Sequence, residues 1–196
     1  MPSFLSSCVI IKNGTFVAGR RCTVRKVLLI CMFVIIIVYV AGMELSFRVD
    51  YGLAPSASGT SLNVSSLTGI GMDVLWYGDG NVSTGFGLNV LISSTNTVTA
   101  IASGTSNFIM DFYVTAIHRV ELKESLDFCI IGLGGPYTSD FARFGMVVKI
   151  LGGFSWSWEN WKFGLFMGME SRLIEIGTTT VRFTQYPVCL NATLQF

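Results

Sequence analysis

The residues with acid–base or nucleophilic chemistry are few in this sequence and stand far apart. His118 is the single histidine, and no serine lies within two residues of it, so the local histidine–serine pair of a hydrolase is missing. The glycine-rich stretch Gly132–Pro136 (GLGGP) has no following lysine and no strand–loop–helix context, so it does not match a phosphate-binding loop. We therefore predict that the chain is not an enzyme and has no catalytic residues.

The cysteines do not indicate a metal or cofactor site. Of the five cysteines, only Cys129 and Cys189 follow residue 42, and they lack the short spacing of a zinc site. We predict that they behave as two unpaired small hydrophobic residues, with no disulfide, no metal ion and no cofactor.

The other chemically active side chains are charges that fall on one face of an alternating pattern. After residue 42, apolar and polar residues alternate repeatedly, which is the period of a β-strand with two different faces. Sustained helical periodicity is missing, so we predict an all-β protein. Its eight strands are expected at residues 43–51, 70–76, 82–92, 108–116, 126–130, 144–158, 161–169 and 188–196.

The predicted connections between these strands alternate between long and short. Long stretches rich in Gly, Ser and Thr include Gly52–Ser66, Ser94–Ser106 and Gly177–Pro187. The short connections are tight turns, such as Gly78–Asn81 and Glu159–Asn160. Long loops at one end and tight turns at the other are typical of an antiparallel up-and-down transmembrane β-barrel with both termini on the turn side.

The chemistry of the two strand faces favours a membrane barrel over a soluble one. A soluble sandwich or lipocalin also alternates, but it turns its apolar face inward and a charged face toward water. Here the polar face is poor in charge, which suits a narrow lumen. We predict that this lumen is lined by Glu44, Arg48, Asp50, Asp73, Asp111, Tyr113, Lys149, Leu151, Phe166 and Glu170. These charges should pair, because an unpaired buried charge is very costly.

Aromatic residues gather at the turn-side ends of the predicted strands. At a membrane surface a tryptophan ring lies among acyl chains while its N–H meets headgroups or water. An alternative is a tryptophan cluster that stiffens a soluble hairpin. We predict that the membrane-interface aromatics are Trp76, Tyr77, Trp156, Trp158, Trp161 and Phe196.

The N-terminal part of the sequence has the pattern of a secretion signal. Residues 27–40 form an unbroken uncharged run preceded by basic residues, and we predict cleavage after Gly42. The predicted domains are thus a leader at 1–42 and a barrel at 43–196; an uncleaved membrane anchor is the alternative. All twelve acidic residues but only eight of the thirteen basic residues follow residue 42, so the mature chain would carry a net charge of −4. This charge argues against a nucleic-acid partner.

Over residues 43–196 the chain resembles the small eight-stranded outer-membrane barrels, and among them the OmpW-type family. The resemblance rests on topology, size, the preceding leader and the C-terminus. The closing residues 188–196 (VCLNATLQF) are similar to that family's assembly signal, although Leu194 stands where an aromatic residue is common. The resemblance implies the bacterial outer membrane as location, with the lipid bilayer and the barrel-insertion machinery as partners.

The same resemblance, with the mixed apolar and charged lumen, implies a narrow channel or carrier for small hydrophobic solutes. The main alternative is a closed barrel that acts as a scaffold, with surface loops that bind host or matrix molecules. A third option is a soluble β-domain tethered by an uncleaved 27–42 segment. Pairing of the lumen charges without a gap would favour the scaffold over the channel.

Overall fold

The structure is a computed structural model that describes residues 9–12, 15–18, 43–77, 81–102, 106–176 and 178–196. The chain divides into two compact units, Met1–Ala41 and Gly42–Phe196. In the first, strands β1 (Val9–Lys12) and β2 (Thr15–Ala18) form an antiparallel pair that the sequence analysis did not predict. The predicted hydrophobic run 27–40 and the predicted cleavage after Gly42 lie outside the described residues.

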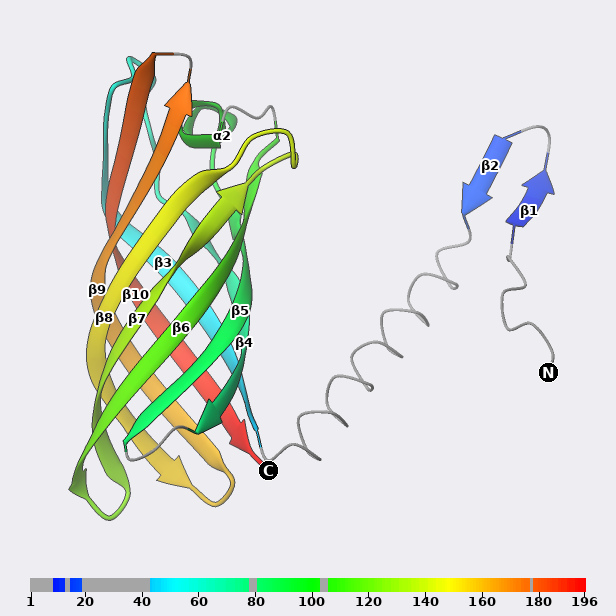
Figure 1. The fold of residues 1–196 in the computed structure, drawn as a ribbon. Coiled ribbons are helices and arrows are strands. Elements are labelled where there is room, and N and C mark those ends of the chain that lie inside the picture. Colours follow the sequence, from blue (N-terminus) through cyan, green and yellow to red (C-terminus); the bar gives the residue numbers. More distant parts are fainter. Residues whose placement is uncertain (1–8, 13–14, 19–42, 78–80, 103–105, 177) are drawn as a thin grey trace. The chain divides into compact units, whose positions relative to one another are not determined.

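The second unit is a closed antiparallel barrel in which every strand pairs with its neighbours in the chain, and the last strand pairs with the first (Figure 1). This confirms the predicted all-β, eight-stranded, up-and-down fold. The strands are β3 (Glu44–Ser58), β4 (Thr68–Tyr77), β5 (Val82–Ile92), β6 (Phe108–Lys123), β7 (Leu126–Thr138), β8 (Gly145–Trp158), β9 (Trp161–Ile176) and β10 (Thr179–Gln195).

The strands extend further on the loop side than the sequence predicts. The prediction of a loop at Gly52–Ser66 is wrong for the first half of that range, because β3 continues to Ser58. Pro55 does not end the strand, since the chain forms a β-bulge there: Ala54 has a φ of 46°, and the pairing with β10 shifts between Thr184 and Tyr186. A bulge tolerates a proline because the missing N–H is not needed for the ladder.

The loop expected at Gly177–Pro187 is also wrong, because β10 begins at Thr179. Val181 and Phe183 alternate with Arg182 in this segment, which is a strand pattern that its many threonines and Pro187 obscured. Pro187 pairs with Gly52 of β3 but has no partner on β9. The proline therefore lies where one ladder is already interrupted.

A short helix lies within the connection expected as an irregular loop at Ser94–Ser106. Helix α2 (Thr95–Ala102) begins after Ser94, whose side chain accepts a hydrogen bond from the Thr97 backbone N–H at 3.3 Å. It lies at the loop end of the barrel and buries Val98 and Ile101 (Figure 1). Among the described residues, no helix has both the length and the apolar character needed to cross a bilayer.

The inside of the barrel is built in layers. A cluster on the turn side includes Leu75, Ile131 and Phe166, and a larger cluster on the loop side joins α2 to inward residues such as Leu91 and Phe183. Between the two clusters lies a layer of charged and polar side chains. The barrel is therefore filled, and its polar centre is enclosed by apolar side chains at both ends.

Candidate functional site: a charged layer that closes the lumen

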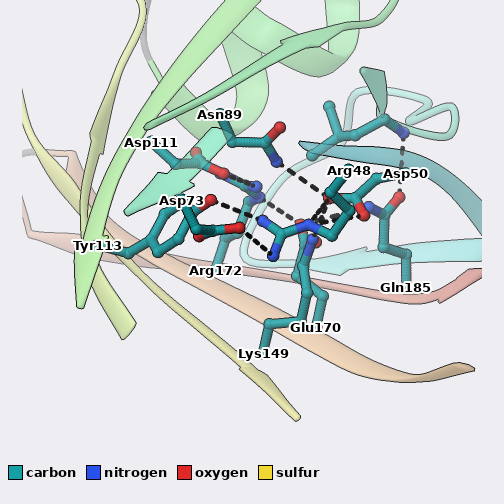
Figure 2. Close-up of polar contacts among 11 residues, drawn as sticks. Arg48, Asp50, Asp73, Asn89, Asp111, Tyr113, Lys149, Glu170, Arg172 and Gln185 are labelled. Carbon is teal, nitrogen blue, oxygen red and sulfur yellow. Dashed lines mark hydrogen bonds and ion pairs between the residues drawn. The ribbon is translucent and has the colours of Figure 1, made fainter. Parts of the chain in front are cut away.

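The charged layer is positioned by alternation along strands that the barrel brings face to face. Arg48 and Asp50 are neighbours on the inward face of β3, and Lys149 points inward from β8. The inward side chains of Glu170 and Arg172 come from β9 (Figure 2). Because the closed barrel arranges β3 and β8 around one lumen, Lys149 reaches Asp50, which lies 99 positions away in the chain.

One chain of ion pairs connects these residues. Arg48 Nε lies 3.1 Å from Asp50 Oδ1, and Lys149 Nζ lies 2.7 Å from Asp50 Oδ2 (Figure 2). The same Lys149 Nζ is 3.0 Å from Glu170 Oε2. Asp50 therefore contacts two cations, and so does Glu170, whose second partner is Arg172. These contacts offset much of the desolvation cost of the two enclosed charges.

Amide side chains add neutral donors to this chain. The amide nitrogen of Asn89 donates to Asp50 Oδ2 at 3.1 Å, and that of Gln185 donates to Glu170 Oε1 at 3.2 Å. These contacts fix the orientation of both carboxylates.

Arg172 is the cation of the charged layer that was not among the predicted lumen residues. Its guanidinium donates two parallel hydrogen bonds to Asp111, at 2.6 and 2.8 Å, and Nε lies 2.6 Å from Glu170 Oε1. It also stacks over the Tyr137 ring, 4.9 Å from the centroid. The predicted strand ended at Met169, although Arg172 has the same inward parity as Glu170, so extending the alternation would have found it.

The layer has one more carboxylate than it has cations. Asp50, Asp73, Asp111 and Glu170 face Arg48, Lys149 and Arg172. Asp73 is the carboxylate of this layer with the longest ion-pair distance. Its contact with Arg48 Nη1 is 3.5 Å long, and its Oδ1 accepts no hydrogen bond within the described part of the chain.

Tyr113 and Tyr137 connect the charged layer to its surroundings. Arg48 Nη2 donates to the Tyr113 hydroxyl at 2.8 Å. The Tyr137 hydroxyl, on the loop side, donates to the backbone carbonyl of Ile101 in α2. Helix α2 is thus tied through Tyr137 to the stacked Arg172, so the loop-end helix and the central ion pairs form one connected body.

Every predicted lumen residue lies inside the barrel with a relative exposure of 4% or less. The charged layer brings most of them together, but three lie elsewhere. Leu151 and Phe166 belong to the turn-side apolar cluster. Glu44 lies at the turn end, 2.9 Å from Arg119 Nη2 and hydrogen-bonded to Gln195.

The outer wall of the same strands is apolar and exposed. Val49, Ile130, Ile150, Met167 and Leu190 all point outward, each with about half or more of its surface accessible. A soluble barrel would bury such residues. This wall instead has the composition of a surface in contact with hydrocarbon.

The predicted interface aromatics lie at the turn-side ends of their strands. Trp76, Trp156, Trp158 and Phe196 are exposed and Trp161 is half-buried. The side chain of Tyr77 lies outside the description of the structure. On the loop side the sequence analysis missed a second aromatic set, in which Phe141 and Phe144 lie 6.5 Å apart by ring centroid and Phe141 contacts Phe112.

Within the described part of the chain, the histidine and the two cysteines are not grouped into one site. His118 points outward from β6, whereas Cys129 and Cys189 are free thiols buried inside the barrel, on β7 and β10. The remaining lumen charges pair locally, as Lys162 does with Asp127 at 3.9 Å. The arrangement therefore offers fixed, mutually paired charges rather than a nucleophile with a base.

Comparison with known proteins shows similarity in structure alone: no family model matches the sequence, and no curated protein matches it. Neisserial surface protein A has 12% identity over 79% of this chain and 97% of its own, with a TM-score of 0.56. The outer membrane protein Ail of Yersinia pestis has 12% identity over 78% and 99%, with a TM-score of 0.39. The N-terminal β-barrel domain of OprF from Pseudomonas aeruginosa has 9% identity over 76% and 96%, with a TM-score of 0.38.

The fold and the apolar outer wall together define a small eight-stranded outer-membrane β-barrel, as the sequence predicted. The narrower resemblance to the OmpW-type family stays a prediction.

Proposed function

We propose that this protein is a closed outer-membrane barrel that serves as a scaffold for its surface loops, rather than an open channel. The observation that carries the proposal is the burial of the central charges. Side chains that line a water-filled pore are exposed to water, whereas Arg48, Lys149 and Arg172 are 2%, 1% and 0% exposed. A narrow channel for hydrophobic solutes would require this ion-paired layer and α2 to move.

The loop end supports the scaffold role because its connections are tied to one another. The Ser65 hydroxyl lies 3.0 Å from Ser94 Oγ and 3.1 Å from Thr97 Oγ1, which joins the β3–β4 connection to the start of α2. Loops held in this way present a defined surface at little entropic cost on binding. We propose host or matrix molecules as the partners of this surface, and no catalytic activity.

The first test is single-channel conductance of the refolded 43–196 chain in a planar bilayer, with folding confirmed by the gel mobility of unboiled samples. We expect a silent barrel. Arg172→Ala, which opens space in the charged layer, should produce leak currents, while Arg182→Ala, on the exposed side of β10, should stay silent. Discrete openings in the unmodified barrel would instead establish the channel.

The loop role is tested separately, by adhesion of cells that display the barrel to surfaces coated with heparin, laminin or fibronectin. In the test variant, a Gly/Ser segment of equal length replaces residues 59–66 and the strands are unchanged; the unmodified barrel is the reference. Adhesion that depends on residues 59–66 supports the scaffold. Equal adhesion with and without them contradicts a role for this connection.

A further inference from the structure

The outer wall of the barrel contains an apolar hollow of about 660 Å³. It lies across the seam where β10 closes onto β3. Its volume falls within the range of about 300–1,000 Å³ that is typical of ligand pockets. Its lining includes the large side chains Phe47, Met72, Leu88, Trp156, Phe163 and Leu190, and the small side chain of Ala192.

The hollow results from one small side chain in a row of large ones. Strand pairing places Trp156 next to Phe163 and Phe163 next to Ala192. On the other side, Ala192 pairs with Phe47, and Phe47 pairs with Met72. The wall therefore stands out on both sides of Ala192 and recedes between them.

The sides of the hollow are held in place by ring contacts and by the strand ladders beneath them. Phe163 lies 5.8 Å from Trp156 and 6.1 Å from Trp161 by ring centroid, the latter nearly parallel at 15°. Backbone pairing runs without a break from Leu190 to Leu194 on both sides of β10. The backbone pairing and the ring contacts therefore define the shape of the hollow.

The position of the hollow along the barrel axis determines what can fill it. The hollow reaches Trp156 near the turn-side end of β8 and extends to Val49 and Ile70, farther along the apolar wall. The turns of such barrels face the periplasm. Water does not solvate the hydrocarbon region, and an empty space there would forfeit van der Waals contacts on every side. An apolar occupant is therefore required.

We propose that this hollow binds one acyl chain of a phospholipid from the periplasmic leaflet and retains it longer than the surrounding lipid. Lipid chains are as apolar as the wall, so binding here rests on packing rather than on a hydrophobic driving force. A flexible chain in a concave site contacts protein on three sides, whereas on the convex wall it contacts protein on one. The inference rests on the membrane insertion in the proposed function, not on the closed lumen.

The experiment is native mass spectrometry of the 43–196 barrel released from vesicles of phosphatidylethanolamine and phosphatidylglycerol. Unmodified barrel should retain one phospholipid after mild detergent removal. Ala192→Phe fills the hollow, so the lipid-bound fraction should fall at least tenfold. Val148→Phe is the matched control, because Val148 points outward from β8 and does not line the hollow; it should retain the lipid.

Equal lipid retention in Ala192→Phe and Val148→Phe overturns the proposal, and so does a barrel that is released without lipid. A dimer that Ala192→Phe abolishes also overturns it, since the hollow would then be a subunit interface. If Ala192→Phe does not fold, photo-crosslinking of unmodified barrel by a diazirine-bearing phospholipid decides. Label concentrated around Phe47 and Met72 supports the site, and label spread evenly over the wall contradicts it. A conducting barrel that still holds its lipid would refute the proposed function alone.

Discussion

The inward and outward faces of the same strands follow opposite chemical rules. On β9, Glu170 and Arg172 point inward and are fully buried, while Met167 and Met169 point outward and are exposed. Charges are tolerated inside because protein partners replace water around them, whereas a charge on the part of the outer wall that meets hydrocarbon is costly because hydrocarbon offers no partner. Exposure alone therefore does not decide where a polar residue belongs; what matters is which groups replace water around it.

The largest loss of folding stability is expected when the Arg172 side chain is removed from the charged layer. Arg172→Ala leaves Asp111 and Glu170 without their guanidinium in an enclosed space, so unfolding should become easier by about 3–5 kcal/mol. Equilibrium urea unfolding in phospholipid vesicles measures this. Arg182→Ala removes the same side chain from an exposed position on β10 and should change the free energy by less than about 0.5 kcal/mol. Equal effects of the two substitutions would mean that the charged layer does not stabilise the barrel.

Placing a charge on the outward face should reduce the free energy of unfolding by slightly less. Met167 is 65% exposed and lies midway along the outer face of β9. Met167→Arg places a charge against the hydrocarbon and should destabilise the inserted barrel by about 2–4 kcal/mol. Glu159→Arg, in the β8–β9 turn, is the control and should be close to neutral. The same unfolding measurement applies, and a neutral Met167→Arg would argue that this face does not contact lipid.

A smaller difference between the two faces is expected when a methyl group is added at an inward and at an outward glycine. A Cβ at Gly87, which faces inward, would collide with the Asp73 carboxylate and lie 2.6 Å from the Tyr113 ring. Gly87→Ala should therefore displace both side chains at a cost of about 1–3 kcal/mol. Gly132 faces outward, and a Cβ there would meet nothing within 4 Å. Gly132→Ala should therefore be neutral or slightly stabilising. Thermal unfolding followed by gel mobility compares the pair, and equal losses in both would contradict the packed lumen.

The alternation in the sequence was enough to predict the barrel, its strand number and the inward position of residues such as Lys149. It could not define the loop-side strand ends, because Pro55 and the threonines before Val181 resemble loop residues. Those strands persist there because neighbouring strands and α2 cover them, which is tertiary packing. The alternation also could not predict which charges pair with each other. The contact between Asp111 and Arg172, for example, depends on how barrel closure and strand stagger bring β6 and β9 together.

The smallest effect is expected at Asp73, which tests the charge balance of the inward face itself. Its nearest cation is 3.5 Å away and its Oδ1 lacks a donor within the described residues, so its charge contributes little attraction. Asp73→Asn equalises carboxylates and cations in the layer and should change the unfolding free energy by no more than about 1 kcal/mol, the typical net value of one hydrogen bond. Asp111→Asn, which weakens the paired contacts with Arg172, should cost about 3 kcal/mol. Because both substitutions exchange a carboxylate for an amide of the same size, the difference isolates pairing from packing. A comparable loss at Asp73 would mean that the ionised Asp73, and not only its better-paired neighbours, holds Arg48 in place.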